Sequence, residues 1–288
     1  MYSADFDYHR ARTIPEALQL MASNPGAKLL AGGHSLIPLL KLRLAMPSAL
    51  IDIGRVPELR GIVARDGTLR IGSLVTHAEL AASPDIRRSA AALGEAAAQV
   101  GDPMVRNRGT IGGNIAHADP ASDLPTVLVA LGAHIEVVGS RGRRTIDAGH
   151  FFTGIMTTAL EEDEIVADVV VPAAGRGEGS AYAKFPHPAS RYAVVGAAAL
   201  IIVKQGTCSA VSVALGGLLP HARRLPSVER ALTGQPANDA TIANAASRAL
   251  QDVGEQANGD LFASAEYRKA MAPVYVKRAL LAAVARAV

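Results

Sequence analysis

Apolar and polar positions along the chain form short segments that predict a mixture of helices and strands. Between residues 13 and 54 they predict a helix, a short strand, a second helix and a strand, in "TIPEALQLMASN", "AKLLA", "LIPLLKLRL" and "ALIDI". This alternation of helices with short buried strands is typical of an α/β unit, and here the unit is small.

Residues 61–172 predict a second and larger α/β unit. It has short strands in "GIVARDGTLRIGSLV", an alanine-rich helix in "RRSAAALGEAAAQV" and a long loop that contains glycines. A helix around "LPTVLVALG" and the strands "AHIEVVG" and "EIVADVVVP" follow.

A small, polar and glycine-rich segment, "AAGRGEGS" at 173–180, predicts a domain boundary. We therefore expect a first domain over 1–175, with subdomains of about 1–55 and 56–175, and a second domain over 176–288. In the second domain "AYAKF", "YAVVGAAALIIV" and "CSAVSVALGG" predict an antiparallel sheet, the middle segment being one or two buried strands, and 226–288 is helical by pattern. The expected class is α+β.

Composition narrows the classes of protein. No apolar stretch approaches the roughly 20 residues that a bilayer span needs, and the polar start "MYSADFDYHRART" does not resemble a secretory signal. We expect a soluble protein of the cytoplasm, with peripheral association with the inner face of the membrane left open. A net charge of +3 with scattered arginines does not suggest nucleic-acid binding. The single cysteine, Cys208, excludes an internal disulfide and any cysteine-ligated zinc or iron–sulfur site in this chain.

Two adjacent glycines stand in "LLAGGHSLIP", between an apolar strand and the start of a helix. Ser35 occupies the expected helix N-cap, and Pro38 falls in the first turn, where its missing N–H matters little. Such a turn directs free amides and the positive end of a helix dipole at one point, which suits a phosphate. An ordinary strand-to-helix turn explains the same residues equally well.

A second double glycine occurs in "RNRGTIGGNIAHADPASDLP", where Thr110, Gly112, Gly113 and Asn114 predict another glycine turn. Two such anion-binding turns suggest a diphosphate held from both sides. Asp123, nine residues after Asn114, is either a hydrogen-bond acceptor for a ribose or a helix cap. Neither loop matches the G-x-G-x-x-G or G-x-x-x-x-G-K-[ST] signatures, which argues against a standard Rossmann site or P-loop.

These two motifs together resemble the FAD-binding medium subunits of the molybdenum hydroxylases, the family of xanthine dehydrogenase and aerobic carbon monoxide dehydrogenase. The likeness extends to "FDYHRA", "DEIVADVVVP" and "YAKF", and the histidine after the first glycine pair is similar to the carbon monoxide dehydrogenase-like members. The resemblance implies a two-part FAD-binding domain of the PCMH/vanillyl-alcohol-oxidase type. It also implies a C-terminal domain of antiparallel sheet plus helices, of the carbon monoxide dehydrogenase flavoprotein type.

The resemblance also implies roles for single residues, with no catalytic residue beyond the flavin except Tyr192 as a candidate flavin cover. The amides of the first loop would hold one side of the FAD diphosphate and the second loop the other. Asp123 would bind the adenosine ribose, Val166 would pack near the flavin, in place of the leucine expected in xanthine dehydrogenase-like members, and Lys184 would approach the isoalloxazine ring. The implied cofactor-binding set is Ala31, Gly32, Gly33, His34, Ser35, Thr110, Ile111, Gly112, Gly113, Asn114, Asp123, Val166, Lys184 and Tyr192.

Several of these residues also have ordinary structural explanations. Lys184 could be a solvated lysine on a strand, and Tyr192 could be packed in the core. His34 and His117 have no partner at metal-ligand spacing, so we expect no metal site. Arg106 and Arg108, which flank the second loop, would either offset phosphate charge or be solvated surface arginines.

The function that we expect is that of a flavoprotein subunit in a molybdenum hydroxylase complex. Electrons would arrive from [2Fe–2S] clusters on a small partner chain, reduce FAD, and leave to quinone, NAD or oxygen. A large partner with the molybdenum cofactor would oxidise carbon monoxide, an N-heterocycle or an aldehyde, in a dimer of heterotrimers. The alternatives are a self-contained FAD-dependent oxidase and a non-catalytic nucleotide-binding module.

Overall fold

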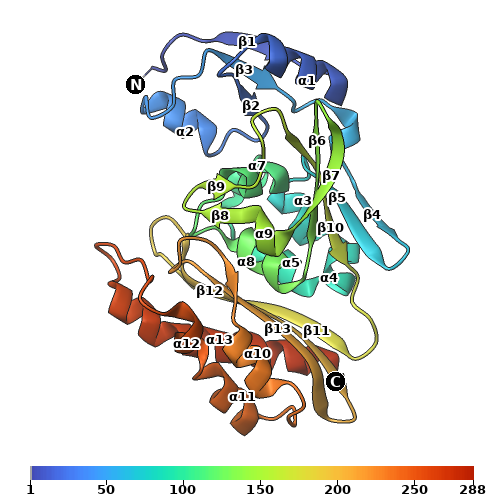
Figure 1. The fold of residues 1–288 in the computed structure, drawn as a ribbon, viewed down its shortest axis with the longest axis vertical. Coiled ribbons are helices and arrows are strands. Elements are labelled where there is room, and N and C mark those ends of the chain that lie inside the picture. Colours follow the sequence, from blue (N-terminus) through green and yellow to red (C-terminus); the bar gives the residue numbers. More distant parts are fainter. Residues whose placement is uncertain (1) are drawn as a thin grey trace.

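The computed structural model describes residues 2–288, and its N-terminal region is a small parallel sheet with two helices (Figure 1). The strand order is β1-β3-β2. The helices and strands expected between 13 and 54 are all present, and the structure adds β1, which pairs in parallel with β3. The elements are β1 (Asp7–Arg10), α1 (Ile14–Ser23), β2 (Lys28–Leu30), α2 (Leu36–Lys41), β3 (Ala49–Asp52) and the 3-10 turn η1 (Pro57–Leu59).

The central region contains a five-stranded antiparallel sheet in the order β4-β5-β10-β6-β7, with short helices packed around it. Its strands are β4 (Ile62–Arg65), β5 (Thr68–Gly72), β6 (His134–Gly139), β7 (Gly142–Asp147) and β10 (Ile165–Pro172), with a small hairpin of β8 (Phe152–Gly154) and β9 (Thr157–Thr158). Its helices are α3 (His77–Ala82), α4 (Pro84–Ser89), α5 (Ala91–Gln99), α6 (Pro103–Arg106), α7 (Ile111–His117), α8 (Asp123–Ala130) and α9 (Ala148–Phe151).

The alanine-rich segment is two helices and not one, which corrects the sequence-based expectation. Ser83 caps α4 through the amide of Ile86, and the chain leaves helical geometry at Ala90, where φ is −151°. The break lets α5 start in a new direction, with the amide of Ala92 donating to Ser180 Oγ at 3.2 Å. A contact with a residue 88 positions away thus replaces the hydrogen bond that a continuous helix would have made.

The second glycine pair also differs from expectation, because it lies inside a helix and not in a turn. Gly112 and Gly113 belong to the first turn of α7. Thr110 is the N-cap of this helix, and its Oγ1 accepts from the Gly113 amide at 3.2 Å. Threonine at this position satisfies an amide that the helix itself cannot pair.

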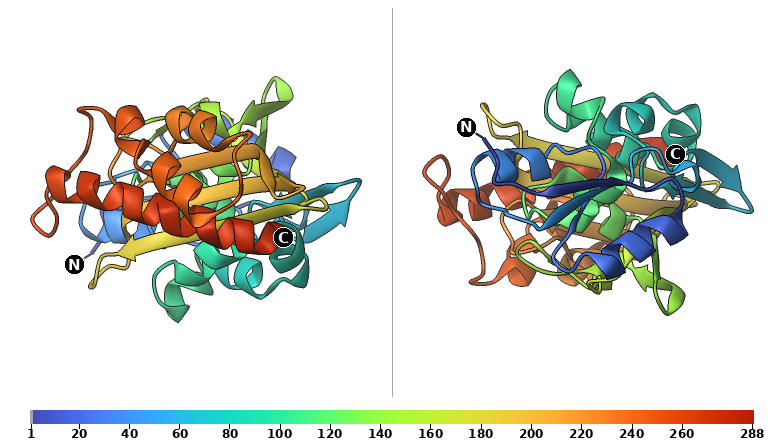
Figure 2. Two further views of the ribbon diagram at one scale, coloured as in Figure 1. Left: turned by 90° about the horizontal axis from the view of Figure 1, so that it is seen from below. Right: turned by 90° about the horizontal axis from the view of Figure 1, so that it is seen from above.

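The C-terminal region is an antiparallel sheet in the order β11-β12-β13-β14, covered on one side by helices (Figure 2). "YAVVGAAALIIV" forms a single strand, and the helical pattern of 226–288 is interrupted by a loop over 254–264. The elements are β11 (Glu178–Pro186), β12 (Ala193–Lys204), β13 (Thr207–Gly216), β14 (Arg223–Arg224), α10 (Pro226–Leu232), α11 (Asp239–Ala246), α12 (Ala249–Val253) and α13 (Ala265–Ala287). Within residues 2–288 no helix is both long and apolar enough to cross a membrane.

Both faces of this sheet are buried, which explains why β12 is apolar at nearly every position. Tyr182 and Ala198 pack with the core of the central region, whereas their neighbours Ala181 and Ala197 pack with the C-terminal helices. Successive side chains of a strand point to opposite faces. Lys184 therefore lies on the same face as Tyr182, directed toward the central region.

Candidate functional site

A cavity of about 800 Å³ lies between the N-terminal region, the central region and the loop before β12. Pockets that bind cofactors and other small molecules typically have volumes of roughly 300–1,000 Å³. All the residues of the implied cofactor-binding set line the cavity except Ile111 and Lys184. Ile111 is fully buried in the central core, so it contributes to packing and not to the wall.

The two double-glycine loops are packed directly against each other. A Cβ added to Gly32 would lie 2.2 Å from the carbonyl oxygen of Arg108 and 2.9 Å from the Cα of Gly109. The next residue, Gly33, has φ of +76°, a conformation that side chains disfavour. Gly32 therefore permits the close approach of the second loop, and Gly33 permits the turn of the first loop.

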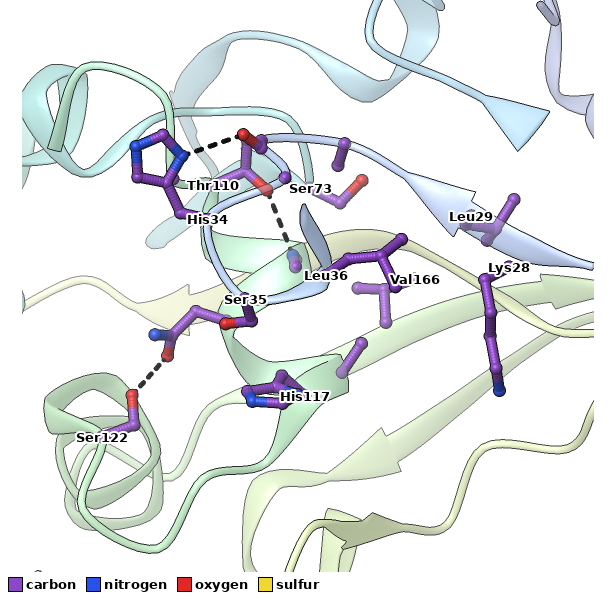
Figure 3. A pocket seen from close by; sticks show the side chains of 18 of the residues that line it. Lys28, Leu29, His34, Ser35, Leu36, Ser73, Thr110, His117, Ser122 and Val166 are labelled. Carbon is purple, nitrogen blue, oxygen red and sulfur yellow. Dashed lines mark hydrogen bonds between the residues drawn. The ribbon is translucent and has the colours of Figure 1, made fainter. Parts of the chain in front are cut away.

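The first loop presents a row of amides with no internal partner. Within residues 2–288, the amides of residues 32–35 donate no hydrogen bond. Ser35 occupies the N-cap position of α2 as predicted, but its side chain makes no capping hydrogen bond. The ring of His34 is held by its Nδ1, 3.1 Å from the carbonyl oxygen of Gly32 (Figure 3). Successive free amides of this kind form an anion-binding concavity.

The second loop has the opposite arrangement, because its amides are already used within the chain. Ile111 donates to the Val75 carbonyl at 2.9 Å, and Gly112 donates to the Ser73 carbonyl at 2.9 Å. Gly113 donates to the Thr110 side chain, and Asn114 donates to the Thr110 carbonyl at 2.9 Å. On this side a ligand therefore meets side chains rather than amides.

Asn114 is the clearest of these side chains. Its Oδ1 accepts from Ser122 Oγ at 2.7 Å, as drawn in Figure 3. That contact orients the side-chain amide and leaves its NH₂ group for another acceptor. A phosphate or a ribose hydroxyl would be a suitable partner.

Asp123 is the first residue of α8 and is buried in a network with β11. Its two carboxylate oxygens accept from Tyr182 Oη at 2.6 Å and from Lys184 Nζ at 2.8 Å. The N-cap of α8 is Ser122, so the expectation that Asp123 caps this helix is wrong. Burial raises the pKa of Asp123 and lowers the pKa of Lys184, and the attraction between the two groups opposes both shifts.

Lys184 lies behind Asp123 and not on the wall of the cavity. Its side chain is 1% exposed, and Nζ also donates to the Gln99 carbonyl at 3.2 Å. The expectation of a solvated lysine is therefore wrong. Because Asp123 and Lys184 form one ion pair, they lie at the same end of the cavity, and of the two only Asp123 reaches its wall.

Tyr192 ends a short loop that leads into β12 and lines the cavity. Tyr192 is 43% exposed, so it is not packed in the core. The loop is closed by two backbone hydrogen bonds, from His187 to Tyr192 and from Arg191 to His187, both 2.8 Å. Tyr192 therefore lies on an ordered turn that is open to solvent.

Val166 lies on another part of the cavity wall, on the side of Leu29 and Lys28 and away from Ser122 (Figure 3).

Arg106, which precedes the second loop, is held by the backbone, and the candidate metal ligands of the sequence form no site in the part of the chain that the structure describes. Arg106 is not a solvated arginine, because its guanidinium donates to the carbonyls of Val100 and Gly101 at 3.1 and 3.0 Å. Across residues 2–288 there is no group of three histidine, cysteine or acidic side chains arranged to hold a metal ion. Cys208 is buried within a strand.

The lining residues that the sequence did not single out include Ser73, His77, Ser122 and Arg191. His77 had a local signal, since "THAE" at 76–79 forms a capping box that starts α3. The other three follow from how distant segments meet, which no local pattern records.

Comparisons with known proteins cover the whole chain. Residues 4–174 match the family described as the FAD binding domain in molybdopterin dehydrogenase, and residues 180–283 match the carbon monoxide dehydrogenase flavoprotein C-terminal domain. The carbon monoxide dehydrogenase medium chain of Hydrogenophaga pseudoflava is 42% identical over 282 residues, which is 98% of both chains. The nicotine 6-hydroxylase medium subunit of Paenarthrobacter nicotinovorans is 34% identical over 97% of both chains.

Solved structures agree with these sequence matches. The carbon monoxide dehydrogenase of Hydrogenophaga pseudoflava that lacks the Mo-pyranopterin moiety superposes with a TM-score of 0.95, at 42% identity and 99% coverage of both chains. Both domains, the length and the fold are thus shared with enzymes of one kind. The chain belongs to the FAD-binding medium subunits of the molybdenum hydroxylases and is similar to the carbon monoxide dehydrogenase medium chain.

Proposed function

We propose that the chain holds FAD in the cavity between its three regions and carries electrons through it in a molybdenum hydroxylase complex. The observation that carries the proposal is the row of free amides at 32–35, packed against the second loop at one side of a large cavity. FAD, when bound, supplies the electron-transfer chemistry, whereas the protein supplies position, electrostatics and limited access.

The residues present fit this cofactor. The amides of Gly32 to Ser35 would bind the diphosphate, and Asn114 and Thr110 would contact it through their side chains. Asp123 and Lys184 would act as a unit, because the carboxylate that faces the cavity is fixed by the ammonium behind it. We propose that this unit orients the flavin-bearing half of the molecule, with Tyr192 as the cover, and that the Val166 side receives the other half. This proposal departs from the resemblance at two residues, because the resemblance implies Asp123 at the adenosine ribose and Val166 near the flavin. The pairing of Asp123 with Lys184 is the reason for the change.

The partners follow from what this chain cannot carry. One cysteine is too few for a [2Fe–2S] cluster, so the clusters would be on a small partner and the molybdenum cofactor on a large one. A dimer of heterotrimers, a cytoplasmic location and an acceptor such as quinone, NAD or oxygen stay predictions. The similar chains belong to enzymes named for carbon monoxide and for nicotine, so the substrate would be decided by the large partner.

The direct test is to purify the chain alone and with its partner chains and to record flavin absorption. We expect stoichiometric FAD in the complex, reduced when the substrate of the large partner is added anaerobically. A colourless complex would contradict the proposal. Reduction of the flavin by an organic substrate without any partner would favour a self-contained oxidase. Binding of ADP with no binding of FAD would favour a nucleotide-binding module.

A further inference from the structure

The second glycine loop poses a problem for a bound diphosphate, because its backbone has no amides to offer. The amides of residues 111–114 are all paired inside the chain. A phosphate that lies between the two loops would have a row of donors on one side only. Further donors on the second side must come from side chains.

Two polar side chains lie directly beneath the second loop and line the cavity. Ser73 is 3% exposed and His77 is 2% exposed. The second loop packs closely against both side chains. A Cβ on Gly112 would lie 2.4 Å from the Cβ of Ser73, and a Cβ on Gly109 would lie 2.9 Å from His77 Nε2. Both glycines thus leave room for this pair.

Neither side chain has its hydrogen-bonding capacity satisfied by the protein. In residues 2–288 only three buried side-chain nitrogen or oxygen atoms have no partner, and two of them are Ser73 Oγ and His77 Nδ1. A buried polar atom without a partner is costly, and in native proteins it usually points to a water, an ion or a functional role. Here both atoms belong to residues that line the same cavity.

The charges around His77 favour an anion. His34 and Arg106 lie close enough to lower its pKa, and together with burial, the largest cause, they bring it to about 4. No carboxylate acts on the ring. Arg106 donates only to backbone carbonyls of the loop before α6, so its charge is not neutralised by an acidic side chain.

We propose that the diphosphate of the bound cofactor is the missing partner of His77, with Ser73 as a second donor beneath the same loop. The inference rests on the proposed function, since it assigns residues to the cofactor named there. The first loop then binds the diphosphate through amides, and the second side binds it through a histidine, a serine and the field of Arg106.

The test measures the affinity of the flavin-free full-length chain for FAD, ADP and riboflavin by fluorescence and calorimetry. His77→Phe keeps the size of the side chain but removes both ring nitrogens. We expect it to weaken FAD and ADP about ten- to hundredfold, as for loss of a hydrogen bond to a charged group, and to leave riboflavin unchanged. His77→Asn, which restores an NH₂ near the position of Nδ1, the atom without a partner, should recover part of the loss. Ser73→Ala should weaken FAD and ADP by a smaller factor.

A matched control exists in His9, whose Nε2 is the third unpartnered buried atom but which does not line the cavity. His9→Phe should leave all three affinities unchanged. If His77→Phe is insoluble, His77→Gln, which has no nitrogen at the position of Nδ1, and Ser73→Ala carry the same comparison. Unchanged ADP affinity in folded His77→Phe or His77→Gln would overturn the inference, and so would an equal loss of riboflavin affinity. A wild-type complex that holds no FAD would overturn the proposed function itself, which is a separate result.

Discussion

The two double-glycine loops share a sequence motif but have opposite roles. In the first loop, the amides of residues 32–35 are free, and Gly33 adopts a positive φ. In the second loop, Gly112 and Gly113 are helical, and every amide from Ile111 to Asn114 is paired. A pair of glycines therefore indicates either close packing of the backbone or an unusual backbone conformation, but it does not show which of the two applies.

The difference follows from what each loop is attached to. The second loop is hydrogen-bonded to the segment that follows β5, through the Ser73 and Val75 carbonyls, and Thr110 forms an isolated bridge with Thr76. The first loop leaves β2 and meets the second through the backbone contact at Gly32. The second loop therefore supports the site, and the first loop, which packs against it, has the free amides for binding.

The largest effect on stability is expected at Asp123, which forms a buried ion pair with Lys184. Asp123→Ala leaves the Lys184 ammonium buried without its partner, and breaking a buried pair in this way costs about 3–5 kcal/mol. Urea unfolding of the flavin-free chain would measure the loss of unfolding free energy. The double variant Asp123→Leu/Lys184→Met should recover most of it. A single variant as stable as wild type would show that the ion pair contributes little.

His77 should make stability depend on pH. Its pKa is about 4 in the folded chain, against the 6.5 of an unperturbed histidine, so the unfolded chain binds more protons between these values. Stability should therefore fall as pH drops from about 6.5 to 4, by as much as about 3 kcal/mol from this group alone.

The measurement is urea unfolding at several pH values for wild type and His77→Gln. The variant should show a shallower loss toward acid, because it lacks the group that is protonated on unfolding. Identical pH dependence in the two proteins would mean that the imidazole is not held neutral.

Gly32 tests whether the contact between the loops is needed for binding. Gly32→Val places a branched side chain where a Cβ already approaches a carbonyl oxygen to 2.2 Å, so the loops must separate. We expect FAD affinity to fall at least about a hundredfold, or about 2.8 kcal/mol. Gly149→Ala, at a position with open space around it, is the matched control. Flavin content equal to wild type in Gly32→Val would remove the basis of the two-loop site.

The smallest effects on stability are expected at the two N-cap residues, Thr110 and Ser35. Thr110→Ala removes a capping hydrogen bond to Gly113 and should cost about 1 kcal/mol of stability. Ser35→Ala removes a side chain that makes no cap and should cost almost nothing, while the amide of residue 35 remains for the cofactor. Thermal unfolding of both variants provides the comparison. A larger loss for Ser35→Ala than for Thr110→Ala would reverse the assignment of support and binding surface.

Local patterns in the sequence predicted most elements, because the period of apolar residues records which face of a segment is buried. They failed where a distant contact decides local geometry. The helix break at Ala90 depends on Ser180, and the helical state of Gly112 depends on its contact with Ser73. Glycine by itself predicts a turn at that position, and packing overrides it.

The sequence by itself determined the two double-glycine motifs, the lack of cysteines for a cluster, and the continuous apolar run of β12, which is buried on both faces. These are properties of residue type and local spacing. Only the tertiary structure decided that the loops touch at Gly32, that one loop keeps its amides free, and that Asp123 is paired with Lys184. Such contacts join residues about 60 to 80 positions apart, and hydrogen-bond partners at that separation are selected by the packing of whole elements.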